Sequence, residues 1–194
     1  MIEQFLDYIQ DYTKPYINDI VGLLSQEIAG CSSEVQFVYK NICISTLINL
    51  VFRAEPEVRQ KYGEKTLQML MQTLMEGKMN QRDLIQNWML VYNHGQEFIA
   101  PVMNQFVQSI FGLIEQKKMQ HFLKRSDGNS KLMNWLRFYY QLIKNMILIM
   151  REKVKQFFPQ FLEYFQQIIS QDIEREMKQE ILSTCVNMVG ISQS

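Results

Sequence analysis

The chain has 194 residues, of which 47% are hydrophobic and 12% aromatic, so it holds enough apolar side chains for a core and is not expected to be disordered. Its twenty basic residues balance twenty acidic ones, and a formal net charge of zero argues against nucleic acid or an anionic membrane surface as the main partner. The longest apolar run, MILIM at 146–150, is far shorter than the roughly 20 residues of a membrane-spanning helix.

Cysteine and histidine are too few and too scattered for a metal site or a disulfide framework. The three cysteines, Cys31, Cys43 and Cys185, share no ligand spacing, and only His94 and His121 accompany them. Such a set is typical of a reducing compartment. The N-terminal MIEQFLDYIQ also lacks the basic start and apolar stretch of a signal peptide. We therefore expect a protein of the cytoplasm, the nucleus or both.

The whole chain reads as helical, because glycine and proline are sparse and strand patterns are nearly absent. Helices are expected at roughly 2–12, 15–29, 34–53, 57–76, 81–94, 98–118, 131–152, 158–170 and 172–189.

Several residues predict where these helices end. Gly30 suits a left-handed C-cap, with Ser32 or Ser33 capping the next helix, and Gly77 closes another helix. Pro56 marks a boundary because the residue before a proline avoids the helical conformation. The segment 116–130, QKKMQHFLKRSDGNS, is expected to form a longer loop or a short connecting helix, and its RSDGNS end is the clearest loop in the chain.

One apolar spacing occurs four times. Counted from Pro15, Pro101 and Pro159, and from Lys65 standing in the proline position, apolar residues follow at offsets that lie on one side of a helix. The four sets are Ile17, Ile20, Val21 and Leu24; Leu67, Leu70, Met71 and Leu74; Met103, Phe106, Val107 and Ile110; and Phe161, Tyr164, Phe165 and Ile168. A further apolar helix lies between successive copies, which predicts stacked helix pairs that bury one another's apolar faces.

These helices resemble those of HEAT repeats. The segments YTKPYINDIVGLLSQ, FIAPVMNQFVQSIFGLI and FFPQFLEYFQQIIS are similar to second helices of HEAT repeats in the importin-β/exportin (karyopherin) superfamily, and DIEREMKQEILSTCVNMVG at 172–190 is similar to a first helix. The resemblance implies an all-α, right-handed α-solenoid of about four HEAT-like antiparallel helix pairs. We expect residues 1–194 to be a single armadillo-like helical repeat domain and a segment of a longer solenoid. A compact helical bundle without repeats is the alternative.

The resemblance implies a protein-binding module of a nuclear transport receptor. Its partners would be protein cargo, the small GTPase Ran or nucleoporin repeats, in import or export. A HEAT scaffold that holds a large assembly together without a transport role is one alternative. A compact bundle is another, with a small ligand enclosed in a cavity ringed by Trp88, Trp135, Tyr139 and Tyr140.

No enzymatic motif is present: GxGxxG, GxxxxGK[ST], GxSxG and HExxH are all missing. We therefore expect no catalytic residue, no metal, no cofactor and no enzyme activity. His94 stands at a helix end, where it would interact with terminal carbonyls. The basic segment 117–125, which includes His121, is expected to be a solvated connection with Phe122 and Leu123 turned inward.

The remaining candidates are surface positions on the second helices, which would line the concave side of a solenoid. Simple solvent exposure is the plainer interpretation of each of these residues: Asp19, Gln26, Gln105, Gln108, Glu163 and Gln166. Trp88 and Trp135 are expected to fill the core. The alternative for the two tryptophans is an aromatic slot that accepts phenylalanine side chains of nucleoporin repeats.

Overall fold

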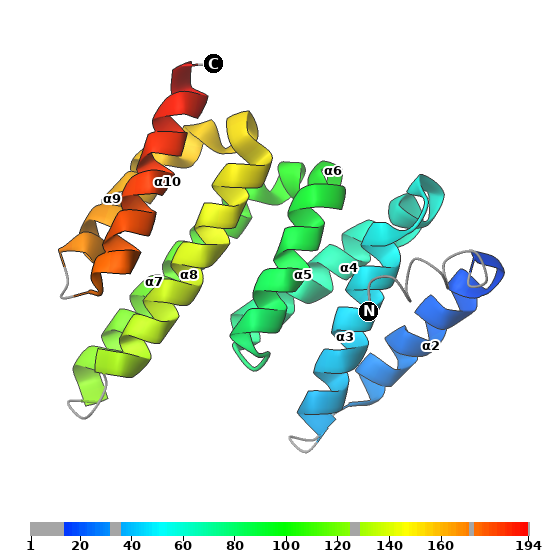
Figure 1. The fold of residues 1–194 in the computed structure, drawn as a ribbon. Helices are drawn as coiled ribbons and strands as arrows, with labels where there is room; N and C mark the ends of the chain where they lie inside the picture. The colour runs from blue at the N-terminus through cyan, green and yellow to red at the C-terminus, as the bar shows by residue number, and fades with distance from the viewer. Residues whose placement is uncertain (1–13, 32–35, 125–128, 171–172, 194) are drawn as a thin grey trace. The chain divides into compact units, whose positions relative to one another are not determined.

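The computed structural model describes residues 14–31, 36–124, 129–170 and 173–193, and within these ranges the chain is helical, with no strand (Figure 1). The prediction of an all-α fold is confirmed. The chain divides into two compact units, Met1–Phe98 and Ile99–Ser194. The expectation of one repeat domain over 1–194 stays a prediction. The helix expected at 2–12 and the caps expected at Ser32 or Ser33 lie outside the described residues.

In the first unit, helices that are two apart in the chain lie against each other. The elements of this unit are η1 (Lys14–Tyr16), α2 (Ile17–Gly30), α3 (Phe37–Arg53), α4 (Pro56–Glu76) and α5 (Gln81–His94), and the short α6 (Gln96–Ile99) ends one residue past the boundary between the units. Helix α3 contacts α2, α4 and α5. Helices α2 and α4 also meet, because Tyr62 Oη and Lys61 Nζ both donate to Asn18 Oδ1, at 2.6 and 3.0 Å. Alternate helices therefore adjoin, α2 with α4 and α3 with α5.

The core of the first unit lies between α3, α4 and α5. Phe52, Leu70 and Trp88, one from each helix, are fully buried. Aromatic rings extend this core, since the Phe52 and Phe98 rings meet edge to face with centroids 6.2 Å apart. Helix α5 begins at a side-chain cap in which Asn80 Oδ1 accepts the main-chain N–H of the second helical residue at 2.8 Å.

The second unit repeats the alternating arrangement. Its elements are η3 (Ala100–Val102), α7 (Met103–Lys124), α8 (Asn129–Met150), η4 (Arg151–Phe157), α9 (Phe158–Ile169) and α10 (Arg175–Gln193). Helix α8 contacts α7, α9 and α10. Helices α7 and α9 meet through the Phe111 ring, whose centroid lies 6.3 Å from that of Phe161 and 5.9 Å from that of Tyr164. Here α7 adjoins α9 and α8 adjoins α10.

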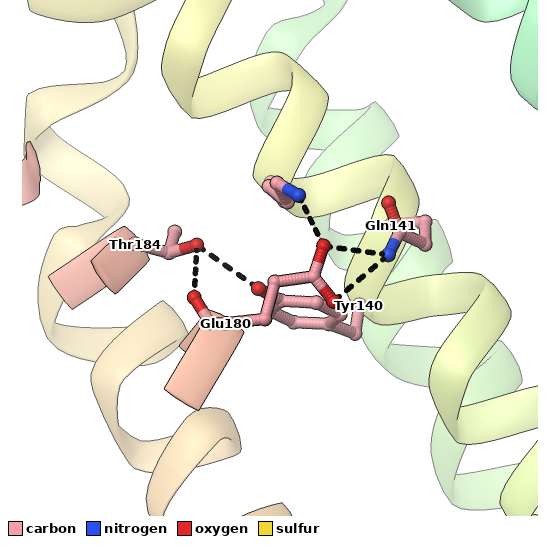
Figure 2. Close-up of polar contacts among 5 residues, drawn as sticks. Tyr140, Gln141, Glu180 and Thr184 are labelled. Carbon is pink, nitrogen blue, oxygen red and sulfur yellow. Dashed lines mark hydrogen bonds and ion pairs between the residues drawn. The ribbon is translucent and has the colours of Figure 1, made fainter. Parts of the chain in front are cut away.

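A polar seam joins α8 to α10 (Figure 2). The hydroxyls of Tyr140 and Thr184 are 2.9 Å apart, and Thr184 Oγ1 donates to the main-chain oxygen of Glu180 at 3.0 Å. The Glu180 carboxylate pairs with Lys144 and accepts from Gln141 Nε2 at 3.3 Å. Burial raises the pKa of Glu180, but the hydrogen bonds from Lys144 and Gln141 outweigh it and hold that pKa below its ordinary value.

The repeated apolar spacing is confirmed as the buried side of its helices. All four sets face the interior, and only Ile20, Leu24 and Met71 are half-buried rather than buried. The prolines that open these helices are exposed, with Pro15 in η1, Pro101 in η3 and Pro159 in the first turn of α9.

Some predicted boundaries hold and others do not. Helix α4 begins at Pro56, and Gly77 ends it with a φ of 63°, as expected. The left-handed cap at Gly30 is wrong, because Gly30 belongs to α2 and the following Cys31 is extended. Of the two expectations for segment 116–130, a longer loop or a short connecting helix, the loop is wrong up to Lys124, whereas residues 125–128 of RSDGNS lie outside the described residues. Helix α7 continues to Lys124, because this stretch contains helix-forming residues and neither glycine nor proline.

The helix expected to run to residue 152 ends earlier. Helix α8 stops at Met150. Arg151 then has a backbone φ of 49°, which few residues other than glycine adopt. A 3-10 helix, η4, then leads to α9 and contacts α8, α9 and α10. Val154 and Phe157 from η4 are buried, so the connection contributes to the core of the second unit.

Candidate functional site

The predicted surface residues are exposed, as a partner-binding or a simply solvated position would be. Two lie on α2 in the first unit and four on α7 and α9 in the second: Asp19, Gln26, Gln105, Gln108, Glu163 and Gln166. Gln105 and Gln108 are three residues apart on one helix, as are Glu163 and Gln166, so each pair shares a helix face. Their role in binding stays a prediction.

The two tryptophans have different surroundings. Trp88 is fully buried on α5 beside Tyr92, with ring centroids 5.9 Å apart, so its ring is not exposed as an aromatic slot would require. Trp135 on α8 is half-buried and stacks on Tyr139 with centroids 5.9 Å apart. Lys117 Nζ lies 4.5 Å from the centroid of Trp135, a cation–π contact that covers part of this ring.

A long groove runs along α3 and α5, two helices that contact each other in the first unit. Its volume is about 1560 Å³. One face of α3, from Val38 to Arg53, forms one wall, and α5 from Asp83 to His94 forms the other. Ile17 and Ile20 of α2, residues 54–58 around the beginning of α4 and residues 78–80 before α5 complete the lining.

The groove carries apolar side chains that no other part of the described chain covers. Val38 and Ile42 on α3 are 72% and 59% exposed, and Met89 on α5 is 38% exposed. Val38 and Ile42 are four residues apart and so lie one above the other on the same helix face. Exposed apolar side chains gathered in one groove favour an interaction surface, whereas scattered ones need no explanation.

Amide side chains line the same groove, and three of them donate through Nδ2 to main-chain oxygens. Asn49 Nδ2 donates to the main-chain oxygen of Ser45, and Asn93 Nδ2 donates to that of Met89, both at 2.8 Å. Asn41 Nδ2 donates to the main-chain oxygen of Lys78 at 3.4 Å. A main-chain oxygen can only accept, so these bonds identify the nitrogen of each amide and leave its Oδ1 available to a donor.

The ionic groups of the lining nearly balance. Arg53 and Lys78 are basic, whereas Glu55, Glu57 and Asp83 are acidic. A balanced lining does not select a strongly charged ligand.

His94 stands where α5 ends. Its main-chain oxygen accepts from Arg59 Nη1 at 3.2 Å, so the interaction with a terminal carbonyl comes from an arginine of α4 and not from the imidazole. Burial, together with the nearby guanidinium groups of Arg59 and Arg53, lowers the pKa of the imidazole. His94 is therefore neutral at pH 7. The side chains of His121, Phe122 and Leu123 lie outside the described residues.

The chain matches no family model, no curated protein and no solved structure. Within the described ranges, no group of histidine, cysteine, aspartate and glutamate side chains could hold a metal ion. None of the described helices has the length and apolar character needed to cross a membrane.

Sequence reasoning did not find this groove. The 34–53 and 81–94 segments are expected as helices, but the candidate surface residues lie on the second helix of each pair. The aromatic slot offered for the first helices rests on Trp88 and Trp135, and Trp88 is buried. One signal was present, since Val38 and Ile42 continue the apolar character of α3 beyond the face formed by Ile44, Leu47 and Val51. A wide apolar surface on a helix is ordinarily read as core, so exposure became visible only with the fold.

Proposed function

We propose that this chain is a protein-binding module of HEAT-like helix pairs, arranged as a right-handed α-solenoid, and that the groove along α3 and α5 receives the partner. The observation that carries the proposal is the cluster of exposed apolar side chains in that groove, with Val38 72% and Ile42 59% exposed. The groove volume of about 1560 Å³ exceeds the roughly 300–1,000 Å³ typical of small-molecule sites. A segment of polypeptide is a better match for its size.

The arrangement within each unit supports the HEAT-like form of the proposal. In both units alternate helices adjoin, as α3 does with α5 and α8 with α10. The proline-led helices turn the same offsets inward in both units, although Ile20 and Leu24 of α2 are half-buried. Both features are expected when helix pairs stack on one another. The most specific form of the proposal is a karyopherin-type transport receptor that recognises protein cargo, Ran or nucleoporin repeats in the cytoplasm and nucleus.

The experiment compares two matched variants. Val38→Lys places a charge in the groove, whereas Val186→Lys places the same charge on α10, outside it. The two valines are 72% and 70% exposed, so neither change should disturb folding. Binding of the purified chain to Ran, to nucleoporin-repeat peptides and to candidate cargo proteins is measured by surface plasmon resonance. We expect Val38→Lys to weaken binding at least tenfold and Val186→Lys to leave it unchanged.

Two results would change the proposal in different ways. Equal binding by both variants would remove the groove from the function. Absence of binding to any transport component would leave a HEAT scaffold of a larger assembly as the remaining role. The solenoid itself is tested by small-angle scattering, because a compact bundle of this length should have a radius of gyration of about 16 Å, and a clearly larger value is expected for a stack.

A further inference from the structure

We propose that the groove binds a partner segment in an extended conformation, with no strong net charge, holding it by main-chain hydrogen bonds to asparagine Oδ1 atoms and by alternate aliphatic side chains. This inference rests on the proposed protein-binding role and specifies the form of the ligand. It is carried by three features of the lining: the spacing of its acceptors, its length and its charge.

The first feature is the spacing of the polar positions on α3. Asn41, Ser45 and Asn49 all line the groove and follow one another at intervals of four residues. On an α-helix this interval corresponds to a rise of about 6 Å. An extended chain presents main-chain N–H groups on the same side about every 6.7 Å. The spacing of the polar positions on α3 and the spacing of the N–H groups in an extended chain therefore agree closely over these few residues.

The second feature is that these amides offer acceptors. With Nδ2 of Asn41 and Asn49 donating to main-chain oxygens, Oδ1 is the atom left for a ligand. Asn93 on α5 donates through Nδ2 in the same way, so its Oδ1 is also left as an acceptor for a ligand. A helical ligand has its main-chain N–H groups already bonded within the helix, so it cannot supply the matching donors. An extended segment has them free.

The third feature is the combination of length and charge. The α3 wall from Val38 to Arg53 is about 22 Å long at 1.5 Å per residue, which an extended chain covers with about six or seven residues. The two basic and three acidic residues of the lining nearly cancel. Charge complementarity therefore favours a segment with little net charge, whose aliphatic side chains contact Val38, Ile42 and Met89.

The test begins with an unbiased probe. A phage-displayed library of random 12-residue peptides is selected on the immobilised full chain, with Val38→Lys and Val186→Lys as counter-screens. We expect peptides that bind the wild type and Val186→Lys but not Val38→Lys, with little net charge and with aliphatic residues at alternate positions.

Main-chain recognition is then tested by replacing single amides of a selected peptide with esters, which removes one N–H donor at a time. Loss of binding of about three- to tenfold is expected at alternate positions, and little change between them. Asn49→Leu and Asn93→Leu in the chain should each weaken the binding of the unmodified peptide by a similar factor. Asn187→Leu, an exposed residue of α10, serves as the control. In Asn49→Leu, the ester at the paired position should have no further effect.

The outcomes separate this inference from the proposed function. Selected peptides that depend on Val38 but tolerate every ester would overturn the extended conformation and keep the groove as a protein-binding site. Peptides rich in one charge, or helical when bound, would do the same. Peptides that bind Val38→Lys as well as the wild type, or no selected peptides at all, would overturn the inference as a whole, while binding of folded partners would still be decided by the plasmon-resonance experiment.

Discussion

The polar seam between α8 and α10 gives a prediction in which two conservative substitutions have unequal effects. The Tyr140 side chain is fully buried, and its hydroxyl lies 2.9 Å from Thr184 Oγ1. The single hydrogen of Thr184 Oγ1 is donated to the main-chain oxygen of Glu180. Tyr140 must therefore be the donor and Thr184 the acceptor in the bond between them. This direction decides what each substitution leaves behind (Figure 2).

The Tyr140→Phe substitution removes the donor together with its hydrogen. Thr184 keeps its bond to Glu180 and loses only an incoming hydrogen bond, so the free energy of unfolding should fall by about 0.5–1.5 kcal/mol. Valine has nearly the same shape as threonine, but Thr184→Val leaves the Tyr140 hydroxyl buried without an acceptor. That costs the desolvation of a polar group, about 1–3 kcal/mol. Thr184→Val should therefore be the more damaging change.

The double variant completes the cycle. With both hydroxyls gone, no buried polar group is left unpaired, so the double variant should be more stable than Thr184→Val alone. The assay is urea denaturation of the four proteins, followed by circular dichroism and by tyrosine and tryptophan fluorescence. If Tyr140→Phe destabilises more than Thr184→Val, or if the two losses simply add, the assignment of donor and acceptor is wrong.

Three further predictions concern stability. Burial raises the pKa of the Tyr164 hydroxyl well above its ordinary 10.0, so the folded state keeps a proton that the unfolded chain releases above about pH 10. Stability should therefore fall as pH rises from 9 to 11, and Tyr164→Phe should reduce this slope by up to about 1.4 kcal/mol per pH unit in urea titrations; an unchanged slope would contradict the argument. Gly22→Ala should stabilise α2 by about 0.5–1 kcal/mol because an added Cβ meets nothing within 4 Å, whereas Gly95→Ala should destabilise by about 1–3 kcal/mol because its Cβ would overlap the buried Phe52 ring. Similar melting temperatures for the two glycine variants would show that the contact at Phe52 relaxes freely. Asn80→Ala removes the side-chain cap of α5 and should cost about 1 kcal/mol by thermal denaturation, with Asn80→Asp retaining most of the stability.

Much of the helical structure could be predicted from local sequence. Helix α5 occupies 81–94 as expected, and α4 begins at Pro56 because proline lacks the N–H that would otherwise be unpaired in the first turn. The errors fall where local signals are weak. The break after Met150 follows no glycine or proline, and the residues around it are ordinary helix formers. The buried side chains of η4 show that packing against α8, α9 and α10 replaces the missing local signal.

The candidate site could be predicted only in part. The exposure of Asp19 and Gln105 follows from helical periodicity, because each lies opposite an apolar stripe. The groove depends on which face of α3 meets α5, and periodicity within one helix contains no such information. Trp88 illustrates the same limit, since its type and spacing fit a buried ring as well as an exposed slot, and only the neighbouring helices bury it fully.

The sequence by itself determined that the chain is helical and which side of each proline-led helix turns inward, because both follow from backbone preferences and from a spacing of 3.6 residues per turn. The tertiary structure alone decided which apolar side chains remain uncovered. Val38 and Ile42 are as hydrophobic as Ile44 and Leu47 on the same helix, yet the first two line a groove and the last two lie in the core. The hydrophobic effect has no direction of its own, so burial depends on where the neighbouring helices lie.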